Sequence, residues 1–266
     1  MDLKLSGKTI IVTGGGSNIG RAISLRLAAE KANVVIADWD EDQASKVVNE
    51  IKNDGGEATV IKTDVTDNAQ VEDMIKKATD KYGPIDVLVN NVAGAGGGHD
   101  DLFINETRDK WERIIDYTLW SVINCTRAVL DQMVERKSGV IVNIGSDAGR
   151  MGEYKEAVYA GCKGAVIALT KALAREVGKF GIRLNVVCPG LTVPDDKEAV
   201  GSKSVWSGEM IDFFNPEARA KAAKSYPLRK IGKAEEIADA VAFMSSDCAS
   251  HITGQTLSVS GGYTMM

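Results

Sequence analysis

Residues Thr9–Gly20 read TIIVTGGGSNIG, a β-branched run followed by a cluster of glycines. A short run that is apolar at nearly every residue is typical of a strand buried on both faces, and Ile19–Lys31 beyond it has the pattern of an amphipathic helix. Glycines between a strand and a helix let the backbone approach a pyrophosphate closely, and the amino end of the helix favours its negative charge. The stretch therefore predicts the first strand–turn–helix unit of a dinucleotide-binding fold.

The glycine turn is stretched relative to the standard dinucleotide fingerprint, and a tight turn without a ligand is the alternative interpretation. Its place between a strand and a helix, near the amino terminus, favours the cofactor. We expect a dinucleotide to be contacted by Gly14, Gly16, Ser17, Asn18, Ile19 and Gly20.

The alternation of strand and helix patterns continues along the chain. Further strands are expected at Asn33–Asp38, Ala58–Lys62, Ile85–Asn90, Gly139–Ile144, Ile182–Cys188 and Gln255–Val259. Further helices are expected at Asp42–Asp54, Asn68–Tyr82, Thr107–Arg136, Tyr154–Phe180 and Ala234–Ser245. Strands joined by long crossovers run parallel, so the expected fold is one α/β domain over residues 1–266. It is a Rossmann-type, doubly wound parallel sheet of about seven strands with helices on both faces.

One connection is much longer than the few residues that usually join a strand to a helix. It runs from Cys188 to the helix near Ala234 and carries Trp206, Phe213 and Phe214 among charges and glycines. We interpret residues 193–226 as a lid over the substrate, with a surface excursion or a subunit contact as the alternative.

The composition narrows the function classes. The formal net charge is −5 and no basic stripe stands out, which gives no support to nucleic-acid binding. No signal-peptide pattern or membrane-spanning run is apparent, and four scattered cysteines and two histidines do not make a metal site. We expect a cytoplasmic protein with reduced cysteines, without a membrane or metal role.

Asp38 ends the second expected strand, about twenty residues after the glycines. A carboxylate there can accept hydrogen bonds from the adenosine ribose and would repel a 2′-phosphate. No lysine or arginine lies between Thr13 and Gly20 to hold that phosphate. These features favour NAD(H) over NADP(H), although a solvated loop carboxylate is the alternative interpretation of Asp38.

Two further pairs of residues stand at the carboxyl ends of strands, where α/β sheets bind ligands. They are Asp64-Val65 and Asn90-Asn91, of which Asp64, Val65 and Asn91 are expected to contact the cofactor. Tyr159 and Lys163, in AVYAGCKG (Ala157–Gly164), are four residues apart and therefore share one helix face. They form either a surface polar pair or a tyrosine whose acidity is tuned by a cation.

Together these features resemble the short-chain dehydrogenase/reductase family over nearly the whole chain. The matching pieces are TGGGSNIG, Asp38, Asp64-Val65, Asn90-Asn91, Ser146, Tyr159-x-x-x-Lys163, Pro189-Gly190 and the tail ITGQTLSVSGG (Ile252–Gly262). The gap of thirteen residues from Ser146 to Tyr159 is the usual one in the family.

The resemblance implies roles for these residues. Tyr159 would exchange a proton with the substrate oxygen, Ser146 would hold that oxygen, and Lys163 would lower the pKa of the phenol and bind the nicotinamide ribose. Tyr159, Lys163, Pro189, Gly190 and Thr192 would contact the NAD cofactor. Family members are commonly tetramers built on two long helices, here Thr107–Arg136 and Tyr154–Phe180, so a homotetramer is expected.

Three departures from the family pattern stand out. Asn18 replaces a glycine, and asparagine tolerates left-handed backbone better than other non-glycine residues. The turn after Asn90-Asn91 reads VAGAGGG, which indicates a one-residue insertion and a pliable loop. Thr118 stands where the family has an asparagine that would hold a proton-relay water; it is either a member of that relay or a core residue.

Fragments around Ser146–Arg150, Glu156–Tyr159 and Asn185–Gly190 are most similar to bacterial dehydrogenases of cyclic hydroxyacyl-CoA compounds, such as 2-hydroxycyclohexanecarboxyl-CoA dehydrogenase. The resemblance implies a NAD-dependent oxidation of a cyclic hydroxyacyl-CoA or related alicyclic alcohol. The alternative is a 3-oxoacyl reductase or a generic secondary-alcohol dehydrogenase. An alternative of another class is a low-activity NAD-binding subunit of a complex.

Overall fold

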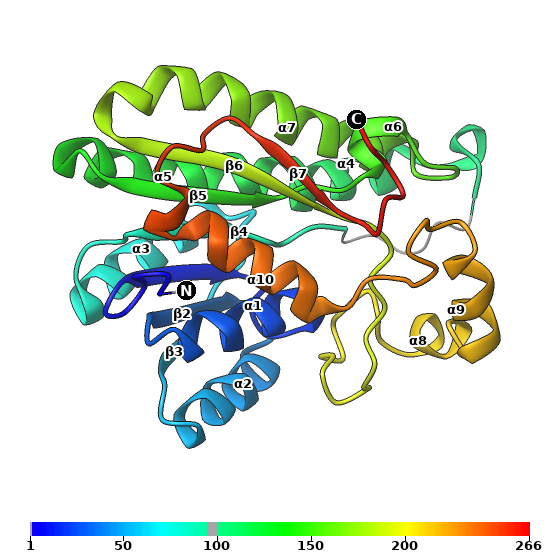
Figure 1. Cartoon of the computed structure of the whole chain (residues 1–266), viewed down its shortest axis with the longest axis horizontal. Helices are drawn as coiled ribbons and strands as arrows, with labels where there is room; N and C mark the ends of the chain where they lie inside the picture. Colours follow the sequence, from blue (N-terminus) through cyan, green and yellow to red (C-terminus); the bar gives the residue numbers. More distant parts are fainter. Residues whose placement is uncertain (1, 95–100) are drawn as a thin grey trace.

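A seven-stranded sheet forms the centre of the molecule (Figure 1). The computed structural model describes residues 2–94 and 101–266. All strand pairings are parallel, and the strand order is β3-β2-β1-β4-β5-β6-β7. The strands are β1 (Thr9–Thr13), β2 (Asn33–Asp38), β3 (Glu57–Lys62), β4 (Val87–Asn90), β5 (Gly139–Ile144), β6 (Ile182–Pro189) and β7 (Thr256–Val259). The predicted fold is therefore confirmed.

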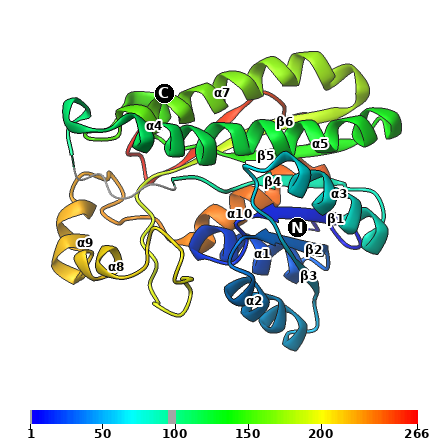
Figure 2. The same cartoon turned by 180° about the vertical axis from the view of Figure 1, so that it is seen from behind.

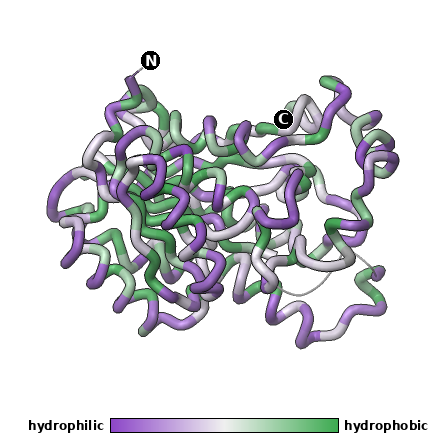
Figure 3. Tube along the Cα trace, turned by 90° about the horizontal axis from the view of Figure 1, so that it is seen from below, coloured by the Kyte–Doolittle hydropathy of each residue, from purple (hydrophilic) through white to green (hydrophobic). Residues whose placement is uncertain are grey.

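Two apolar layers cover the two faces of this sheet (Figures 1 and 2). One layer packs α1 (Asn18–Ala29), α2 (Glu41–Asn53) and α10 (Ala234–Ser245) against the sheet. The other packs α3 (Asn68–Tyr82), α5 (Ser121–Arg136) and α7 (Ala157–Val177). Along β1, Ile10 and Val12 face the first layer and Ile11 faces the second, which explains the continuous apolar run. Figure 3 shows hydrophobic residues gathered in the interior of the molecule and hydrophilic residues mostly on its outer loops.

The expected helix over Thr107–Arg136 is interrupted. It consists of α4 (Arg108–Ile115), a π-helical segment η2 (Asp116–Trp120) and α5. A π-helical turn has one residue more than an α-helical turn, and such turns are frequent at functional sites. The second long helix, α7, begins at Ala157 rather than Tyr154, after a turn that contains the short helix α6 (Ala148–Met151).

One helix among the described residues is long and apolar enough to cross a membrane by length and composition. It is Ala157–Phe180, with a mean hydropathy of 1.3 in its most apolar window. Val166, Ala174 and Val177 are buried on its inner side, two of them in the second apolar layer, so it is a sheet-covering helix with an apolar outer side.

The long connection after β6 contains α8 (Glu209–Phe213) and α9 (Pro216–Ala223) and lies at the carboxyl end of the sheet (Figure 1). Thr192 at its start forms an isolated parallel bridge with Gly232 near its end. The segment therefore leaves and returns at one point of the sheet edge.

Candidate active site

A cavity of about 880 Å³ lies at the carboxyl ends of the strands. It extends from the glycine turn after β1 to Tyr263, near the carboxyl terminus, and the long connection forms part of its wall. Parallel sheets bind ligands at this edge because the loops that follow the strands converge there.

The glycine turn leaves no room for side chains at two of its positions. Gly14 has φ +61°, and a Cβ on it would lie 3.0 Å from Cγ2 of Val92. A Cβ on Gly20 would lie 2.0 Å from the carbonyl oxygen of Gly14. Asn18 adopts φ +43°, the left-handed conformation expected of a residue in place of glycine. This close backbone packing fits a pyrophosphate cradle at the start of α1.

Asp38 is buried at the end of β2, beside this turn. Its Oδ2 accepts a hydrogen bond from the Gly16 N–H at 2.9 Å and its Oδ1 accepts one from the Asp40 N–H at 3.0 Å. Burial raises the pKa of the Asp38 carboxyl, and the two backbone N–H groups oppose that rise. The nearest cation after the turn, Arg21, binds both oxygens of Glu50 at 2.6 and 2.7 Å. The carboxylate therefore has a fixed orientation at the end of the cavity predicted for the adenosine.

Asn91 lines the cavity and also contacts the glycine turn. Its side-chain amide donates to the carbonyl oxygens of Thr13 and Gly14, both at 3.1 Å, and its N–H donates to Oγ1 of Thr13 at 2.9 Å. Asp64 and Val65 line the same cavity, as does Ile19. The fold therefore brings Ile19, Asp64, Val65 and Asn91 to one cavity. The hydrogen bonds of Asn91 also hold the glycine turn in shape.

Tyr159, Lys163 and Ser146 converge in the middle of the cavity. Lys163 is 1% exposed, its Nζ donates to the carbonyl oxygen of Ile144 at 2.6 Å, and it lies 5.7 Å from the centre of the Tyr159 ring. Ser146 forms a side-chain hydrogen bond with Tyr159 that favours the ionised phenol. A surface polar pair is therefore the wrong interpretation of Tyr159 and Lys163.

The electrostatics of this group depart from the sequence expectation. Burial raises the pKa of the Tyr159 phenol, the nearby Glu156 charge raises it further, and the hydrogen bond with Ser146 only partly opposes this. Burial also lowers the pKa of the Lys163 ammonium to about 8. We expected Lys163 to lower the pKa of Tyr159; burial dominates instead and raises it. The phenol is therefore protonated at neutral pH.

Thr118 is fully buried in the π-helical segment. Its Oγ1 accepts a hydrogen bond from the N–H of Gly94 at 3.3 Å, so it contacts the loop that follows β4. The insertion was predicted in the turn Val92–Gly98, of which Ala95–Gly98 lie outside the described residues. The role of Thr118 in a proton relay stays a prediction.

We expect Thr118→Val to lower kcat by about 10²-fold if the hydroxyl belongs to a proton relay. The change keeps the shape of the side chain and removes its polar atom. Thr118→Ser keeps the hydroxyl and is the matched control. Steady-state kinetics with thermal unfolding of each variant test this, and an unchanged kcat in Thr118→Val would leave only a packing role.

Pro189, Gly190 and Thr192 follow β6 and line the cavity opposite the glycine turn. The carbonyl oxygen of Thr192 accepts from Nδ2 of Asn18 at 3.4 Å, while the other amide atom, Oδ1 of Asn18, is buried without a partner. Asn18 therefore links the two loops that would surround a bound dinucleotide.

The predicted lid already contacts the glycine turn. The Asn18 N–H donates to the carbonyl oxygen of Ala199 at 3.0 Å, and the Gly201 N–H donates to Oγ of Ser17 at 2.8 Å. Further along, Trp206 and Phe214 line the cavity, with ring centres 5.7 Å apart. Phe213, in contrast, is exposed. Movement of this segment stays a prediction.

Sequence reasoning assigned no site role to several residues that line the cavity wall. Tyr263 donates a hydrogen bond to Oε2 of Glu153 at 2.7 Å and stacks on Tyr226, with ring centres 4.9 Å apart. Glu156 lies on the same wall. Trp39, which follows Asp38, also lines the cavity, 5.5 Å from the ring of Tyr117. Its place directly after Asp38 was the one available signal.

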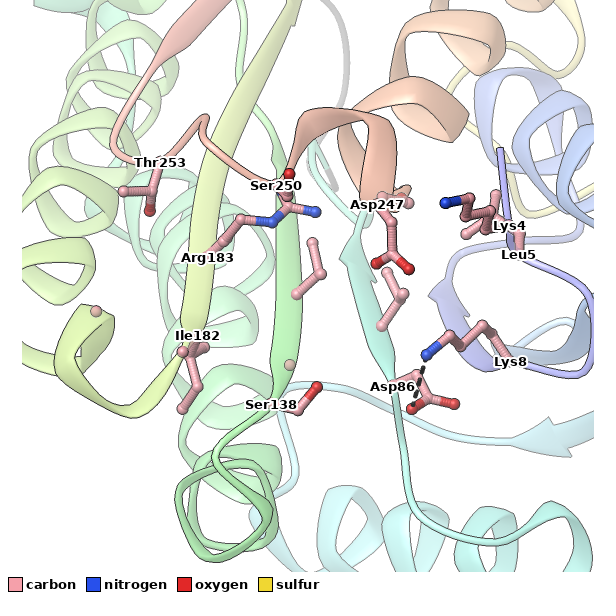
Figure 4. Close-up of a pocket in the computed structure, with 16 residues that line it drawn as sticks. Lys4, Leu5, Lys8, Asp86, Ser138, Ile182, Arg183, Asp247, Ser250 and Thr253 are labelled. Atoms are coloured by element: carbon pink, nitrogen blue, oxygen red, sulfur yellow. Dashed lines mark ion pairs between the residues drawn. The ribbon is translucent and has the colours of Figure 1, made fainter. Parts of the chain in front are cut away.

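A second cavity, of about 300 Å³, lies at the opposite edge of the sheet (Figure 4). The guanidinium of Arg183 donates to the carbonyl oxygens of Met244, Ser246 and Ile252, and Lys8 pairs with Asp86 at 3.9 Å. These charges have structural roles. Within residues 2–94 and 101–266, no group of acidic, histidine or cysteine side chains is suited to a metal ion.

Comparison with known proteins agrees with this geometry. A family model described as enoyl-(acyl carrier protein) reductase matches residues 14–264. The chain belongs to the short-chain dehydrogenase/reductase family. It is 38% identical over 259 residues to the 3-oxoacyl-[acyl-carrier-protein] reductases FabG of Staphylococcus epidermidis and Staphylococcus aureus. The match covers 97% of this chain and 99% and 98% of those proteins.

A 3-oxoacyl-[acyl-carrier-protein] reductase FabG of Thermotoga maritima is 34% identical over 260 residues, which are 98% of this chain and 99% of that protein. The family prediction is thus confirmed, and the chain is an oxidoreductase of this family. The names of these relatives agree with the alternative substrate, a 3-oxoacyl compound, better than with a cyclic hydroxyacyl-CoA.

Proposed function

We propose that this protein is a NAD(H)-dependent oxidoreductase that interconverts β-hydroxyacyl and β-oxoacyl thioesters. The observation that carries the proposal is the convergence of Tyr159, Ser146 and Lys163 in a cavity that reaches from the glycine turn to the long connection. The relatives are named as 3-oxoacyl reductases. A 2-hydroxycyclohexanecarboxyl thioester has the same arrangement of oxygen and thioester, with its carbons closed into a ring. Both substrates expected from the sequence therefore belong to one chemical class.

The residues present fit a nicotinamide dinucleotide. The glycine turn, whose Gly14 and Gly20 leave no space for a Cβ, would hold its pyrophosphate, and Asp38 would bind its adenosine ribose. When bound, this cofactor supplies the hydride acceptor or donor of the reaction. Lys163 would bind the other ribose.

The chain itself handles the proton. In the reducing direction, the Tyr159 hydroxyl donates its proton to the substrate oxygen, which Ser146 orients by a hydrogen bond. Lys163 stabilises the phenolate that remains. In the oxidising direction the phenolate takes the proton of the substrate hydroxyl. The aromatic residues Trp206 and Phe214 of the long connection exclude water from one side of the cavity.

A direct test uses matched substrates. Initial rates would be measured with NADH for linear β-oxoacyl-CoA, cyclic 2-oxocyclohexanecarboxyl-CoA, a β-oxoacyl group on acyl carrier protein, and plain cyclohexanone. We expect the thioesters to have the higher kcat/KM, and the carrier that gives the highest value identifies the partner. Turnover of cyclohexanone without turnover of any thioester would exclude the proposed substrate class. Binding of NADH without turnover of any substrate would instead favour a NAD-binding subunit.

We expect the protein to bind NAD(H) more tightly than NADP(H), because the Asp38 carboxylate repels a 2′-phosphate. Asp38→Ala should narrow that preference by about tenfold, the effect of losing one charge-assisted contact of 1–2 kcal/mol. Titration of both cofactors, followed by fluorescence, gives the ratio. Asp42→Ala, an exposed carboxyl on α2, is the control. Equal or tighter binding of NADP(H) by the wild-type protein would contradict the cofactor assignment.

We also propose a cytoplasmic homotetramer. The apolar outer side of α7 and the half-exposed Trp120 at the end of η2 support the tetramer, because such surfaces usually face another subunit. Light scattering coupled to size-exclusion chromatography measures the mass directly.

A further inference from the structure

Two glutamates line the wall of the cavity that contains the reacting phenol. Glu153 and Glu156 precede α7, and both line the cavity that contains Tyr159 and Ser146. The proposed reaction gives neither of them a task. Alkyl carbons gain nothing from carboxyl groups, so an entirely apolar substrate does not explain their place.

The backbone holds Glu156 on the same side of the helix as Tyr159. The Glu156 N–H donates to the carbonyl oxygen of Glu153 at 3.1 Å, and the Glu156 carbonyl oxygen accepts from the Ala160 N–H at 2.7 Å. Glu156 is thus fixed at the start of α7, three residues before Tyr159. Residues three apart are neighbours on a helix surface. The charge of Glu156 accordingly acts on the Tyr159 phenol.

The two glutamates differ in their surroundings. Oε2 of Glu153 accepts a hydrogen bond from the hydroxyl of Tyr263 at 2.7 Å. Burial raises the pKa of the Glu156 carboxyl to about 7, and the Glu153 charge adds to the rise. The charged and titratable groups that share this wall are Glu153 and Lys155 before α7, Tyr159 on α7, Tyr226 after α9 and Tyr263 near the carboxyl terminus. At neutral pH a large part of Glu156 is a carboxylic acid, which is a hydrogen-bond donor.

We propose that Glu156, which lines the cavity beside Tyr159 and Ser146, is a specificity-determining residue that donates a hydrogen bond to the thioester carbonyl oxygen of the substrate. A β-oxoacyl thioester has two carbonyl groups, the ketone and the thioester, and a single carbon atom joins their carbonyl carbons. Tyr159 and Ser146 take the oxygen that reacts, and Glu156 takes the other. This inference rests on the proposed function and names the group that distinguishes a thioester from a simple ketone.

The sign of the interaction depends on protonation. A neutral carboxyl donates to a carbonyl oxygen, whereas an ionised carboxylate next to that oxygen is repelled and has no proton to give. Binding of the thioester therefore weakens as pH rises through about 7. A simple ketone has no second oxygen and does not depend on Glu156 in this way.

The test compares two substrates in three proteins. Reduction of a β-oxoacyl-CoA and of cyclohexanone would be measured for the wild type, Glu156→Gln and Glu156→Ala. We expect Glu156→Ala to lower kcat/KM for the thioester about tenfold more than for cyclohexanone, the usual effect of one lost hydrogen bond, mostly through KM. Glu156→Gln retains a donor and should restore the ratio. An equal loss for both substrates, or no loss, would overturn the proposal.

The pH profile separates this role from a structural one. For the wild type, KM for the thioester should rise between pH 6 and 8, whereas for Glu156→Gln it should stay flat. Glu153→Gln removes a charge that raises the pKa of Glu156, so the rise should begin at a lower pH. A profile unchanged by both variants would also overturn the proposal. Turnover of cyclohexanone alone by the wild type would instead show that the proposed substrate class is wrong.

Discussion

Tyr159→Phe is expected to reduce turnover by about 10³- to 10⁴-fold, the contribution of a positioned general acid. The ring still packs at the start of α7, while the proton that Tyr159 would transfer to the substrate oxygen is removed. Cofactor affinity should change little, because the glycine turn and Asp38 are untouched. Single-turnover kinetics and NADH titration measure the two quantities separately.

The pH dependence of the wild-type reaction rates tests the same role of Tyr159. Burial and the Glu156 charge raise the pKa of Tyr159, so the phenol stays protonated through neutral pH. Reduction needs that proton, so titration of Tyr159 should change the rate of reduction little around neutral pH. Oxidation needs the phenolate and should accelerate as pH rises above neutral.

Tyr154→Phe is the matched control for this experiment. Tyr154 lies in the loop before α7 and lines the same cavity as Tyr159. Unlike Tyr159, it is not on the helix, and it is 73% exposed. It should retain the turnover of the wild type. If Tyr159→Phe also retained it, the assignment of the proton donor would be wrong.

The fold was accessible from the sequence because its signals are local. Continuous apolar strands and long amphipathic helices gave element bounds close to those observed, and α3 (Asn68–Tyr82) and α10 (Ala234–Ser245) coincide with the expected ranges. The glycine turn was equally clear, because Gly14 has a left-handed φ of +61° and a Cβ on Gly20 would lie 2.0 Å from the carbonyl oxygen of Gly14 within the same turn.

The rest depends on contacts between distant parts of the chain. The stacking of Tyr226 on Tyr263 and the hydrogen bond from Tyr263 to Glu153 join the long connection, the carboxyl terminus and the loop before α7. No local pattern indicates such contacts. The pKa of Tyr159 was misjudged for the same reason: the sequence shows its neighbour Lys163 but not how deeply both are buried.

Lys163→Met should impair both catalysis and cofactor binding. The ammonium is fully buried and its Nζ donates to the carbonyl oxygen of Ile144, so its position is fixed near the Tyr159 ring. Without it, the phenolate formed in reduction loses its stabilising charge, and the cofactor ribose would lose its donor. We expect kcat to fall by about 10²- to 10³-fold and the Kd for NADH to rise about tenfold. A variant with wild-type kcat would exclude this role.

The stability of the same variant provides a second, independent measurement. Burial lowers the pKa of Lys163 from its ordinary value of 10.5 to about 8, so folding disfavours the charged form. Between pH 8 and 10.5, Lys163 binds more protons in the unfolded chain than in the folded one. The free energy of unfolding of the wild type should therefore increase as pH rises from 8 to 10. Lys163→Met lacks this gain, which amounts to about 3 kcal/mol in full. Urea unfolding of both proteins at pH 7, 8.5 and 10 gives the difference, in which other titrating groups cancel. If the difference in free energy of unfolding between the wild type and Lys163→Met did not increase with pH, burial would not lower the pKa of Lys163. The proposal that a buried ammonium stabilises the phenolate would then be wrong.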